Sequence, residues 1–168
     1  MNQVYLVVAL LLTLVAFRPV DADEPRTQSL VSGLQLRRLP LELTNIDSVA
    51  YGPAGRLYAA GYDGRVHLLI DSDGDGLEDR VTTYWDEPGD LLTPVGMLAN
   101  EEGVYVAARG KIALLKDIDG DGQADVSETV ASGWVKESYN GDTRNDAAGL
   151  AIDQDGNLYF SLGCMSYN

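Results

Sequence analysis

Short apolar runs of four to six residues, separated by clusters of Gly, Asp and Asn, recur along this chain of 168 residues. Runs of this length with such borders are typical of β-strands, because a helix of a globular protein needs about ten residues or more. The pattern predicts strands at Leu57–Ala60, Val66–Ile70, Val81–Tyr84, Pro94–Ala99, Val104–Ala108, Ile112–Lys116, Val126–Val130, Ala147–Ile152 and Asn157–Leu162. We therefore expect an all-β protein.

The predicted strands form a repeat. Tyr58, Tyr105 and Tyr159 mark the same place in three copies and are 47 and 54 positions apart. A period of roughly 40–50 residues with about four short strands in each copy is typical of propeller blades. The tight turns expected between the first two strands of the copies are Pro53–Arg56, Asn100–Gly103 and Asp153–Gly156. The repeat predicts a partial β-propeller of about two and a half blades.

Two acidic loops stand at matching places in the first two copies, D-S-D-G-D-G-L-E-D at Asp71–Asp79 and D-I-D-G-D-G-Q-A-D at Asp117–Asp125. Each has carboxylates at positions 1, 3, 5 and 9 and glycine at position 6, which is the spacing that suits Ca²⁺. Carboxylates this close repel one another unless a cation neutralises them. The predicted ligands are the side chains of Asp71, Asp73, Asp75 and Asp79 with the carbonyl of Leu77, and those of Asp117, Asp119, Asp121 and Asp125 beside Gln123, with Glu128 as a further candidate. We expect the bound ions to be structural.

Helix–loop–helix calcium sites share this spacing and are the first alternative. Glu128 falls at position 12 of the second loop, where those sites place a bidentate glutamate, whereas the first loop has Thr82 there. Only six residues, Arg65–Ile70, separate Gly64 from the first loop, which is too short for a stable helix. The flanks therefore favour strand–loop–strand. Acidic turns without an ion are the second alternative.

The N-terminus predicts export. An apolar stretch, Val4–Phe17, is followed by small residues at Val20 and Ala22, so that residues 1–22 are expected to be a secretory signal peptide and residues 23–168 the propeller part. Its first residues lack Lys and Arg, which leaves an uncleaved anchor as the alternative. We expect a periplasmic or extracellular protein with no transmembrane segment after removal of the signal.

The amino-acid composition limits the classes of molecule that this chain is expected to bind. The net charge is −14 and the pI is near 4.2, which argues against nucleic acids and anionic membranes. The single cysteine, Cys164, is either a small buried apolar residue or a thiol with a partner elsewhere. The single histidine, His67, lies within an apolar strand and is expected to pack.

The chain holds fewer than three copies of its own repeat, whereas a closed propeller needs at least about four blades. We therefore expect an N-terminal fragment of a longer protein, with the rest of the propeller needed to close the fold.

The segment G-L-A-I-D-Q-D-G-N-L-Y-F-S-L-G at Gly149–Gly163, together with the D-x-D-G-D-G-x-x-D loops, resembles secreted propeller proteins of planctomycete-type bacteria. These are described as membrane-bound dehydrogenases or haem-binding propeller proteins, and they are distantly similar to quinoprotein glucose and sorbosone dehydrogenases. The resemblance covers most of residues 30–168. It implies the propeller of a sugar or alcohol dehydrogenase that uses pyrroloquinoline quinone and passes electrons to haem. The resemblance implies both cofactors only for the full-length protein, and haem cannot be assigned to this chain, because it has no C-x-x-C-H motif.

One departure from the quinoprotein pattern bears on activity. Those relatives often carry a histidine just before the G-L that opens this strand, whereas Ala148 stands here and cannot abstract a proton. The catalytic residues are therefore unknown. Arg144 and Asp146 are either channel-facing polar groups or ordinary turn residues, and Trp134–Asn145 is a candidate binding surface.

The alternative to an enzyme is a non-catalytic extracellular propeller that binds a carbohydrate, another small molecule or a protein. A calcium-sensing or dockerin-like module is disfavoured by the separation of 46 positions from Asp71 to Asp117 and by the β-strands expected on either side of the loops.

Overall fold

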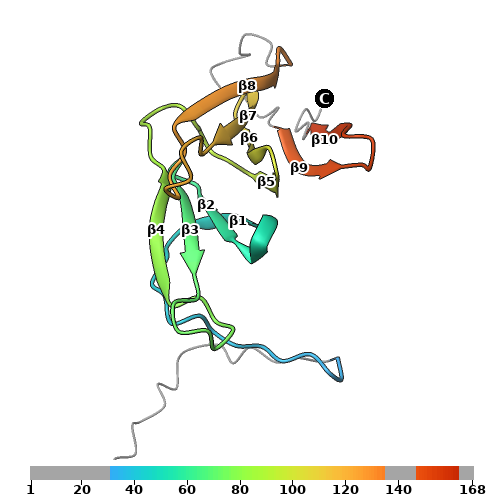
Figure 1. Cartoon of the computed structure of the whole chain (residues 1–168). Helices are drawn as coiled ribbons and strands as arrows, with labels where there is room; N and C mark the ends of the chain where they lie inside the picture. The colour runs from blue at the N-terminus through green and yellow to red at the C-terminus, as the bar shows by residue number, and fades with distance from the viewer. Residues whose placement is uncertain (1–30, 135–146, 163–168) are drawn as a thin grey trace, which may run out of the picture. The chain divides into compact units, whose positions relative to one another are not determined.

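The computed structural model describes residues 31–134 and 147–162. Its strands lie in the compact unit Arg38–Asn168 and form three antiparallel sheets that follow one another along the chain (Figure 1). The first sheet consists of β1 (Ile46–Tyr51), β2 (Leu57–Gly61), β3 (Val66–Ile70) and β4 (Arg80–Trp85), with a single 3₁₀ turn, η1 (Pro53–Gly55), after β1. The second consists of β5 (Gly96–Asn100), β6 (Gly103–Ala108), β7 (Lys111–Lys116) and β8 (Val126–Ser132), and the third of β9 (Ala147–Ile152) and β10 (Leu158–Leu162). The prediction of an all-β protein is confirmed.

Each predicted strand is present, with ends that differ by at most two residues. The structure adds β1, which the apolar pattern did not predict. In β1 the polar residues Asp47 and Ser48 interrupt the apolar run, and alternate side chains are exposed. Such a half-exposed strand is defined by its pairing, here the antiparallel register that places Ala50 opposite Tyr58.

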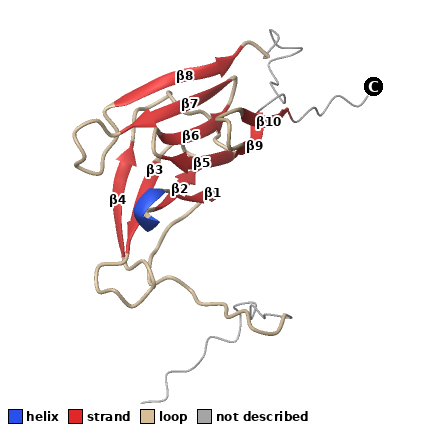
Figure 2. Cartoon of the chain, turned by 45° about the vertical axis from the view of Figure 1, so that its right-hand side comes forward, coloured by secondary structure: helices blue, strands red, loops and turns tan. Residues whose placement is uncertain are grey.

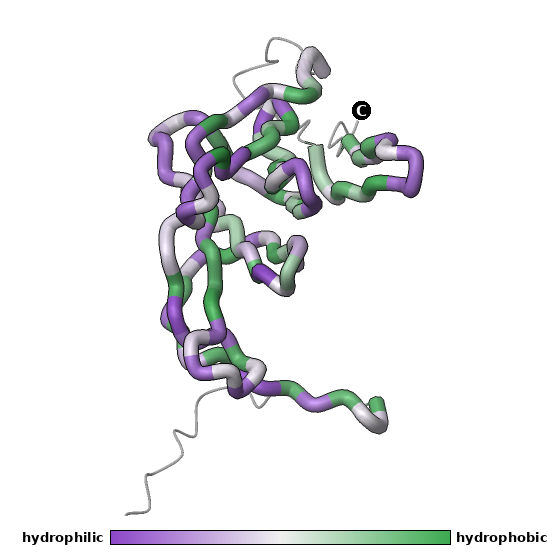
Figure 3. Tube along the Cα trace, viewed as in Figure 1, coloured by the Kyte–Doolittle hydropathy of each residue, from purple (hydrophilic) through white to green (hydrophobic). Residues whose placement is uncertain are grey.

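The middle strands are almost wholly apolar because both faces of their sheets are covered (Figure 3). Successive side chains of a strand point to opposite faces, so Tyr58 and Ala60 of β2 belong to one core while Leu57 and Ala59 belong to another. The core between the first two sheets is built from Tyr58, Ala60, Val66, Leu68, Tyr84, Leu91, Met97, Val104, Val106, Ala108, Ala113 and Leu115. The first two sheets therefore pack face to face.

The remaining faces are covered by different means. Leu39, Leu41 and Leu43 alternate along an extended segment and pack on Leu57 and Leu69 of the first sheet. On the far face of the second sheet, the buried residues Tyr105, Ala107, Ile112 and Leu114 pack with Ala147, Leu150 and Leu158 of the third sheet. The second sheet is thus enclosed between the other two.

The sheets approach one another most closely at the first strand of each. β1 contacts β5, and β5 contacts β9, whereas β4 and β8 lie on the outside (Figure 2). Glycine is required at this approach: a Cβ added to Gly96 would lie 2.8 Å from the backbone nitrogen of Gly149. A Cβ added to Gly52 would lie 3.1 Å from the Cβ of Ala99. The sheets therefore converge toward β1, β5 and β9.

Several predicted features lie outside the described residues: the signal peptide over residues 1–22, the segment 135–146 with Arg144 and Asp146, and Cys164. The predicted division into residues 1–22 and 23–168 stays a prediction. Within the described part of the chain, no helix has the length and apolar character that crossing a bilayer requires.

Candidate metal centres

The first acidic loop connects β3 to β4 and is organised around the carboxylate of Asp71. The backbone N–H groups of Gly74 and Gly76 donate to its two oxygens at 2.7 and 2.9 Å. Asp73 and Asp75 each accept a hydrogen bond from the amide two residues ahead, at 3.1 and 2.8 Å. Gly74 and Gly76 adopt φ angles of 78° and 85°, a left-handed conformation that favours glycine and turns the chain sharply. The sequence therefore dictates a tight loop with three carboxylates along its inner edge.

The second acidic loop connects β7 to β8 and repeats the same hydrogen bonds. Asp117 accepts from the amides of Gly120 and Gly122 at 2.8 and 3.0 Å. Asp119 and Asp121 accept from the amides two residues ahead, at 3.1 and 2.8 Å. Two loops of different sequence at positions 2, 7 and 8 thus adopt one conformation, which is set by the shared aspartates and glycines.

The ninth residue closes each loop back on its second residue. Asp79 accepts hydrogen bonds from the backbone N–H and the hydroxyl of Ser72, at 2.9 and 2.8 Å. Asp125 accepts from the backbone N–H of Ile118 at 2.7 Å. The carboxylate at position 9 therefore supports the loop even before any ligand is considered.

Carboxylate oxygens converge in both loops. One oxygen each from Asp71, Asp73 and Asp75 lies within 4.8 Å of the others, and the same holds for Asp117, Asp119 and Asp125. Oxygens that share a Ca²⁺ at about 2.3–2.6 Å can be at most about 5 Å apart. Both groups therefore fit a common calcium ion, and the binding of an ion by either loop stays a prediction.

The remaining predicted ligands are placed differently. Asp79 and Asp121 belong to their loops but not to the two converging groups. Leu77 and Gln123 hold position 7, with their amides donating to Asp75 and Asp121. Glu128 lies in β8 opposite Leu114, where its carboxylate accepts a hydrogen bond from Lys116 at 2.8 Å. The structure does not bring Glu128 into the second group, because the strand begins at Val126 and carries the residue away from the loop.

Hydrogen bonds within the first loop favour the ionised forms of Asp71 and Asp79. Donation from the backbone of Gly76, with Gly74 and Asp75 adding to it, lowers the pKa of Asp71. Donation from the backbone and side chain of Ser72 lowers the pKa of Asp79. A cation that binds at neutral pH therefore displaces no proton from these groups.

A third acidic turn, D-Q-D-G-N at Asp153–Asn157, joins β9 to β10 and behaves differently. Asp153 accepts hydrogen bonds from the side chain of Asn157 at 2.9 Å, from its backbone at 2.8 Å and from the hydroxyl of Tyr159 at 2.9 Å. These donors, the Asn157 side chain first, lower the pKa of Asp153 to about 2. Hydrogen-bond donors of the protein itself thus satisfy the carboxylate of Asp153. The sequence predicted only a tight turn here and not this role of Asp153.

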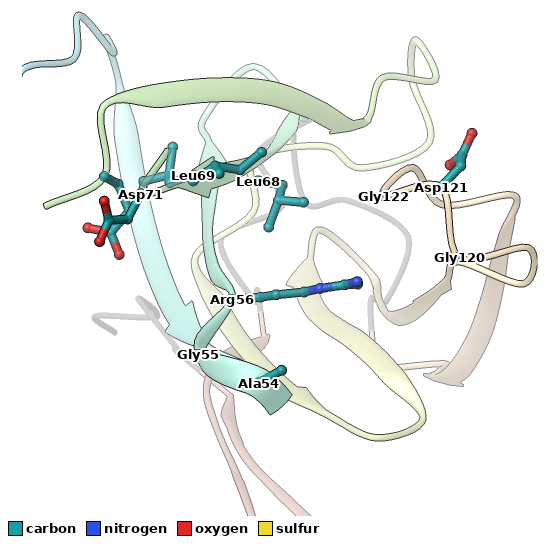
Figure 4. Close-up of a pocket in the computed structure, with 11 residues that line it drawn as sticks. Ala54, Gly55, Arg56, Leu68, Leu69, Asp71, Gly120, Asp121 and Gly122 are labelled. Atoms are coloured by element: carbon teal, nitrogen blue, oxygen red, sulfur yellow. The ribbon is translucent and has the colours of Figure 1, made fainter. Parts of the chain in front are cut away.

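A cleft of about 430 Å³ separates the two loops (Figure 4). Its wall is formed by Asp71 of the first loop, by Gly120–Gly122 of the second and by Leu68 of β3. The side chain of Arg56 extends from the end of η1 across this space, and its guanidinium lies 3.9 Å from a carboxylate oxygen of Asp117. Arg56 is the residue of this site that sequence reasoning missed, because it comes from the neighbouring copy of the repeat.

Two further candidate residues have ordinary surroundings. His67 lies in β3 opposite Ala59 and Thr83, and burial, partly offset by the charge of Asp63, lowers its pKa. Ala148 lies in β9, and its carbonyl accepts a hydrogen bond from the hydroxyl of Ser161 at 2.5 Å. Neither residue belongs to the acidic groups.

These observations define the class: an all-β protein of repeated antiparallel sheets with an acidic loop between the third and fourth strand of each complete sheet. The family model described as a domain of unknown function (DUF7133) matches residues 47–167, and the chain belongs to this family. The match begins within β1 and spans all three sheets. A search of curated proteins gives no match to this chain.

Proposed function

We propose that this chain forms part of an exported β-propeller whose two acidic loops bind Ca²⁺ and thereby stabilise the sheets that carry them. The observation that carries the proposal is the matching hydrogen-bond pattern of the two loops, each of which brings three carboxylate oxygens together. They occupy the same place in successive sheets, share four carboxylate-to-amide hydrogen bonds and converge three oxygens within the span of one calcium ion.

The propeller assignment has its own support. Each complete sheet contains four antiparallel strands in chain order, and the sheets pack face to face while converging at β1, β5 and β9. Blades of a propeller have four such strands, and their first strands surround a central axis. Export rests on the apolar N-terminal sequence and the small residues before the expected cleavage point.

Thermal unfolding in Ca²⁺ and in EDTA tests the calcium function. A ligand at one hundred times its Kd stabilises the folded state by about 2.7 kcal/mol, so we expect Ca²⁺ to raise Tm by roughly 5–15 °C. Asp71→Asn combined with Asp117→Asn should abolish the rise. Asp155→Asn serves as the control, because it removes one acidic charge from the third turn and leaves both loops intact. Identical melting curves in Ca²⁺ and EDTA would refute the calcium function.

For the activity of the complete propeller, we favour binding of a carbohydrate or another small molecule over catalysis. The observation behind this choice is Ala148, an alanine on β9 where quinoprotein relatives often carry a histidine. The dehydrogenase alternative rests on resemblance alone, which is a weak guide to chemistry. Full-length protein reconstituted with pyrroloquinoline quinone, Ca²⁺ and a sugar panel should reduce no dye, whereas a glycan array should give a selective response. Dye reduction by any sugar of the panel would reverse this preference.

A further inference from the structure

The first two sheets leave a groove between them. The cleft of about 430 Å³ that Arg56 crosses is continuous with a second cleft of about 400 Å³ beside Arg80. Leu68 and Ile70 of β3, together with Gly122 opposite them, line both clefts. Each volume is in the range of small-molecule sites, about 300–1,000 Å³. The two clefts are called the inter-sheet groove below.

The strand register places Arg56 and Arg80 on the same face of the first sheet. Arg80 pairs directly with Ile70, so their side chains share a face. Arg56 stands two residues before Tyr58, whose side chain faces the second sheet, and Ile70 packs on that same core. The two arginines therefore flank Ile70 from β2 and β4, two strand spacings or about 10 Å apart.

The repeat does not require an arginine at either place. The matching registers of the two sheets make Gly103 the counterpart of Arg56 and Val126 the counterpart of Arg80. Neither counterpart carries a charge, and the second sheet forms the same four strands. The two guanidiniums are therefore not needed to build the sheet that carries them.

The guanidinium of Arg56 has hydrogen-bond donors that the protein does not use. Its side chain is 47% exposed and extends across the cleft (Figure 4), and its ion pair with Asp117 at 3.9 Å is longer than a hydrogen bond. Within residues 31–134 and 147–162, this guanidinium donates no hydrogen bond. The chain reaches Arg56 through Ala54, which lines the same cleft and has a φ angle of 56°. Backbone strain of this kind in a non-glycine residue is concentrated at binding sites.

The charges around the groove favour a neutral ligand. The acidic residues Asp71, Glu78 and Asp121 line it together with the two arginines, so that positive and negative groups nearly balance. These carboxylates oppose an anionic ligand, and the guanidiniums oppose a cationic one. A hydroxyl group both donates and accepts hydrogen bonds, so it can pair with either kind of group. The C–H face of a sugar ring can pack on Leu68 and Ile70.

We propose that the inter-sheet groove binds a neutral oligosaccharide, with the guanidiniums of Arg56 and Arg80 donating hydrogen bonds to its hydroxyl groups. The spacing of the two arginines exceeds a single sugar ring, so the ligand spans at least two sugar units. The inference rests on the proposed carbohydrate binding and adds to it the site and the ligand class. It does not depend on an ion in either acidic loop.

Calorimetry of the full chain with hexasaccharides tests the groove. The neutral probes are cellohexaose, xylohexaose, mannohexaose and maltohexaose, and hexagalacturonate is the anionic comparison, all at one Ca²⁺ concentration. At least one neutral probe should bind, and Arg56→Gln and Arg80→Gln should each weaken its binding at least about tenfold. Arg56→Lys keeps the charge but not the planar fork, so it should weaken binding as well. Arg109→Gln, in the turn before β7 and outside the groove, is the matched control and should bind within about twofold of the wild type.

The outcomes separate the groove from carbohydrate binding as such. If a neutral probe binds equally well to the wild type and to both glutamine variants, carbohydrate binding stands and the groove is overturned. If no neutral probe binds, the groove is overturned, and the glycan array on the full-length protein decides the proposed function by itself. Binding of hexagalacturonate alone, lost in Arg56→Gln, would overturn the neutral ligand.

Nuclear magnetic resonance of the arginine Nε–H groups gives a second measurement, which is made on the wild type and is therefore independent of any misfolded variant. A bound neutral probe should shift the Nε–H signals of Arg56 and Arg80 and leave that of Arg109 in place. Unshifted signals of Arg56 and Arg80 at saturating probe would overturn the groove.

Discussion

At the scale of single residues, the shared aspartates and glycines fix the two loops and one arginine makes them unequal. The carboxylate at position 1 of each loop receives two backbone hydrogen bonds. In the described part of the chain, Asp117 but not Asp71 also faces a guanidinium, that of Arg56 at 3.9 Å. A positive charge beside a ligand offsets part of the repulsion in the ion-free loop and repels an incoming cation. Arg56 is therefore expected to weaken calcium binding at the second loop.

Arg56→Gln should tighten binding of Ca²⁺ to the second loop severalfold, because a positive charge beside the carboxylates opposes an incoming cation by an energy on the order of 1 kcal/mol in water. Calorimetry in the Asp71→Asn/Asp73→Asn background isolates that loop. Arg109→Gln is the matched control: it removes the same charge from the turn before β7, at the opposite end of that strand from the loop. Equal affinities for Arg56→Gln and the control would show that the guanidinium does not act on the site.

At the scale of elements, the three connections that carry acidic residues divide into two kinds. The loops after β3 and β7 converge carboxylates on one another, whereas the turn between β9 and β10 surrounds a single carboxylate, Asp153, with protein donors. The first kind is expected to respond to cations. The second is expected to respond to pH, since its stability depends on Asp153 remaining ionised.

Because the pKa of Asp153 is lowered from an ordinary 3.8 to about 2, its ionised form favours the folded turn. This stabilisation is fully present only well above pH 3.8, decreases as the pH falls through that value and is lost once the pH passes below about 2. An NMR titration of the Asp153 carboxyl carbon should show this low midpoint. Asn157→Ala removes the largest cause of the shift and should move the midpoint upward, whereas Asp155→Asn keeps the backbone donor of residue 155 and should leave it in place. An unmoved midpoint in Asn157→Ala would contradict the assignment.

At the scale of the molecule, two of the hydrophobic cores are each formed by residues of two neighbouring sheets. Leu115 of β7 is fully buried and belongs to the core between the first and second sheets. The far face of the same sheet packs on β9 and β10 through Ile112 and Leu114. A defect in the second sheet is therefore expected to reach both neighbours.

Leu115→Ala should reduce the free energy of unfolding by about 2–5 kcal/mol, the usual cost of truncating a buried leucine. Trp85 packs beside this core and Trp134 beside the core on the far face of the second sheet. The tryptophan fluorescence and the far-ultraviolet circular dichroism should therefore report one shifted transition. Ile118→Ala is the control, because Ile118 is 70% exposed, and it should change stability by less than about 0.5 kcal/mol. Two separate transitions in Leu115→Ala would show that the sheets unfold independently.

The sequence predicts what depends on local pattern. The strands whose central residues are buried, such as β2 and β7, are apolar runs between turn residues and can be predicted from that pattern. Both acidic loops can be predicted from the spacing of their aspartates and glycines. What it does not predict depends on neighbours in space. The sequence of β1 mixes polar and apolar residues and does not predict a strand, and its strand conformation is defined by its pairing with β2. Glu128 has the right spacing, but β8 places it opposite Leu114, and its carboxylate accepts a hydrogen bond from the side chain of Lys116. Arg56 reaches Asp117 only because consecutive sheets pack face to face.

The number of calcium ions bound per chain tests the account most directly. Native mass spectrometry or equilibrium dialysis of the full chain should give two Ca²⁺. One ion should be lost in Asp71→Asn/Asp73→Asn, a different one in Asp117→Asn/Asp119→Asn, and both in the combined variant. A chain that binds no Ca²⁺, or binds the same number in all four proteins, would contradict the claim that these aspartates form two cation sites.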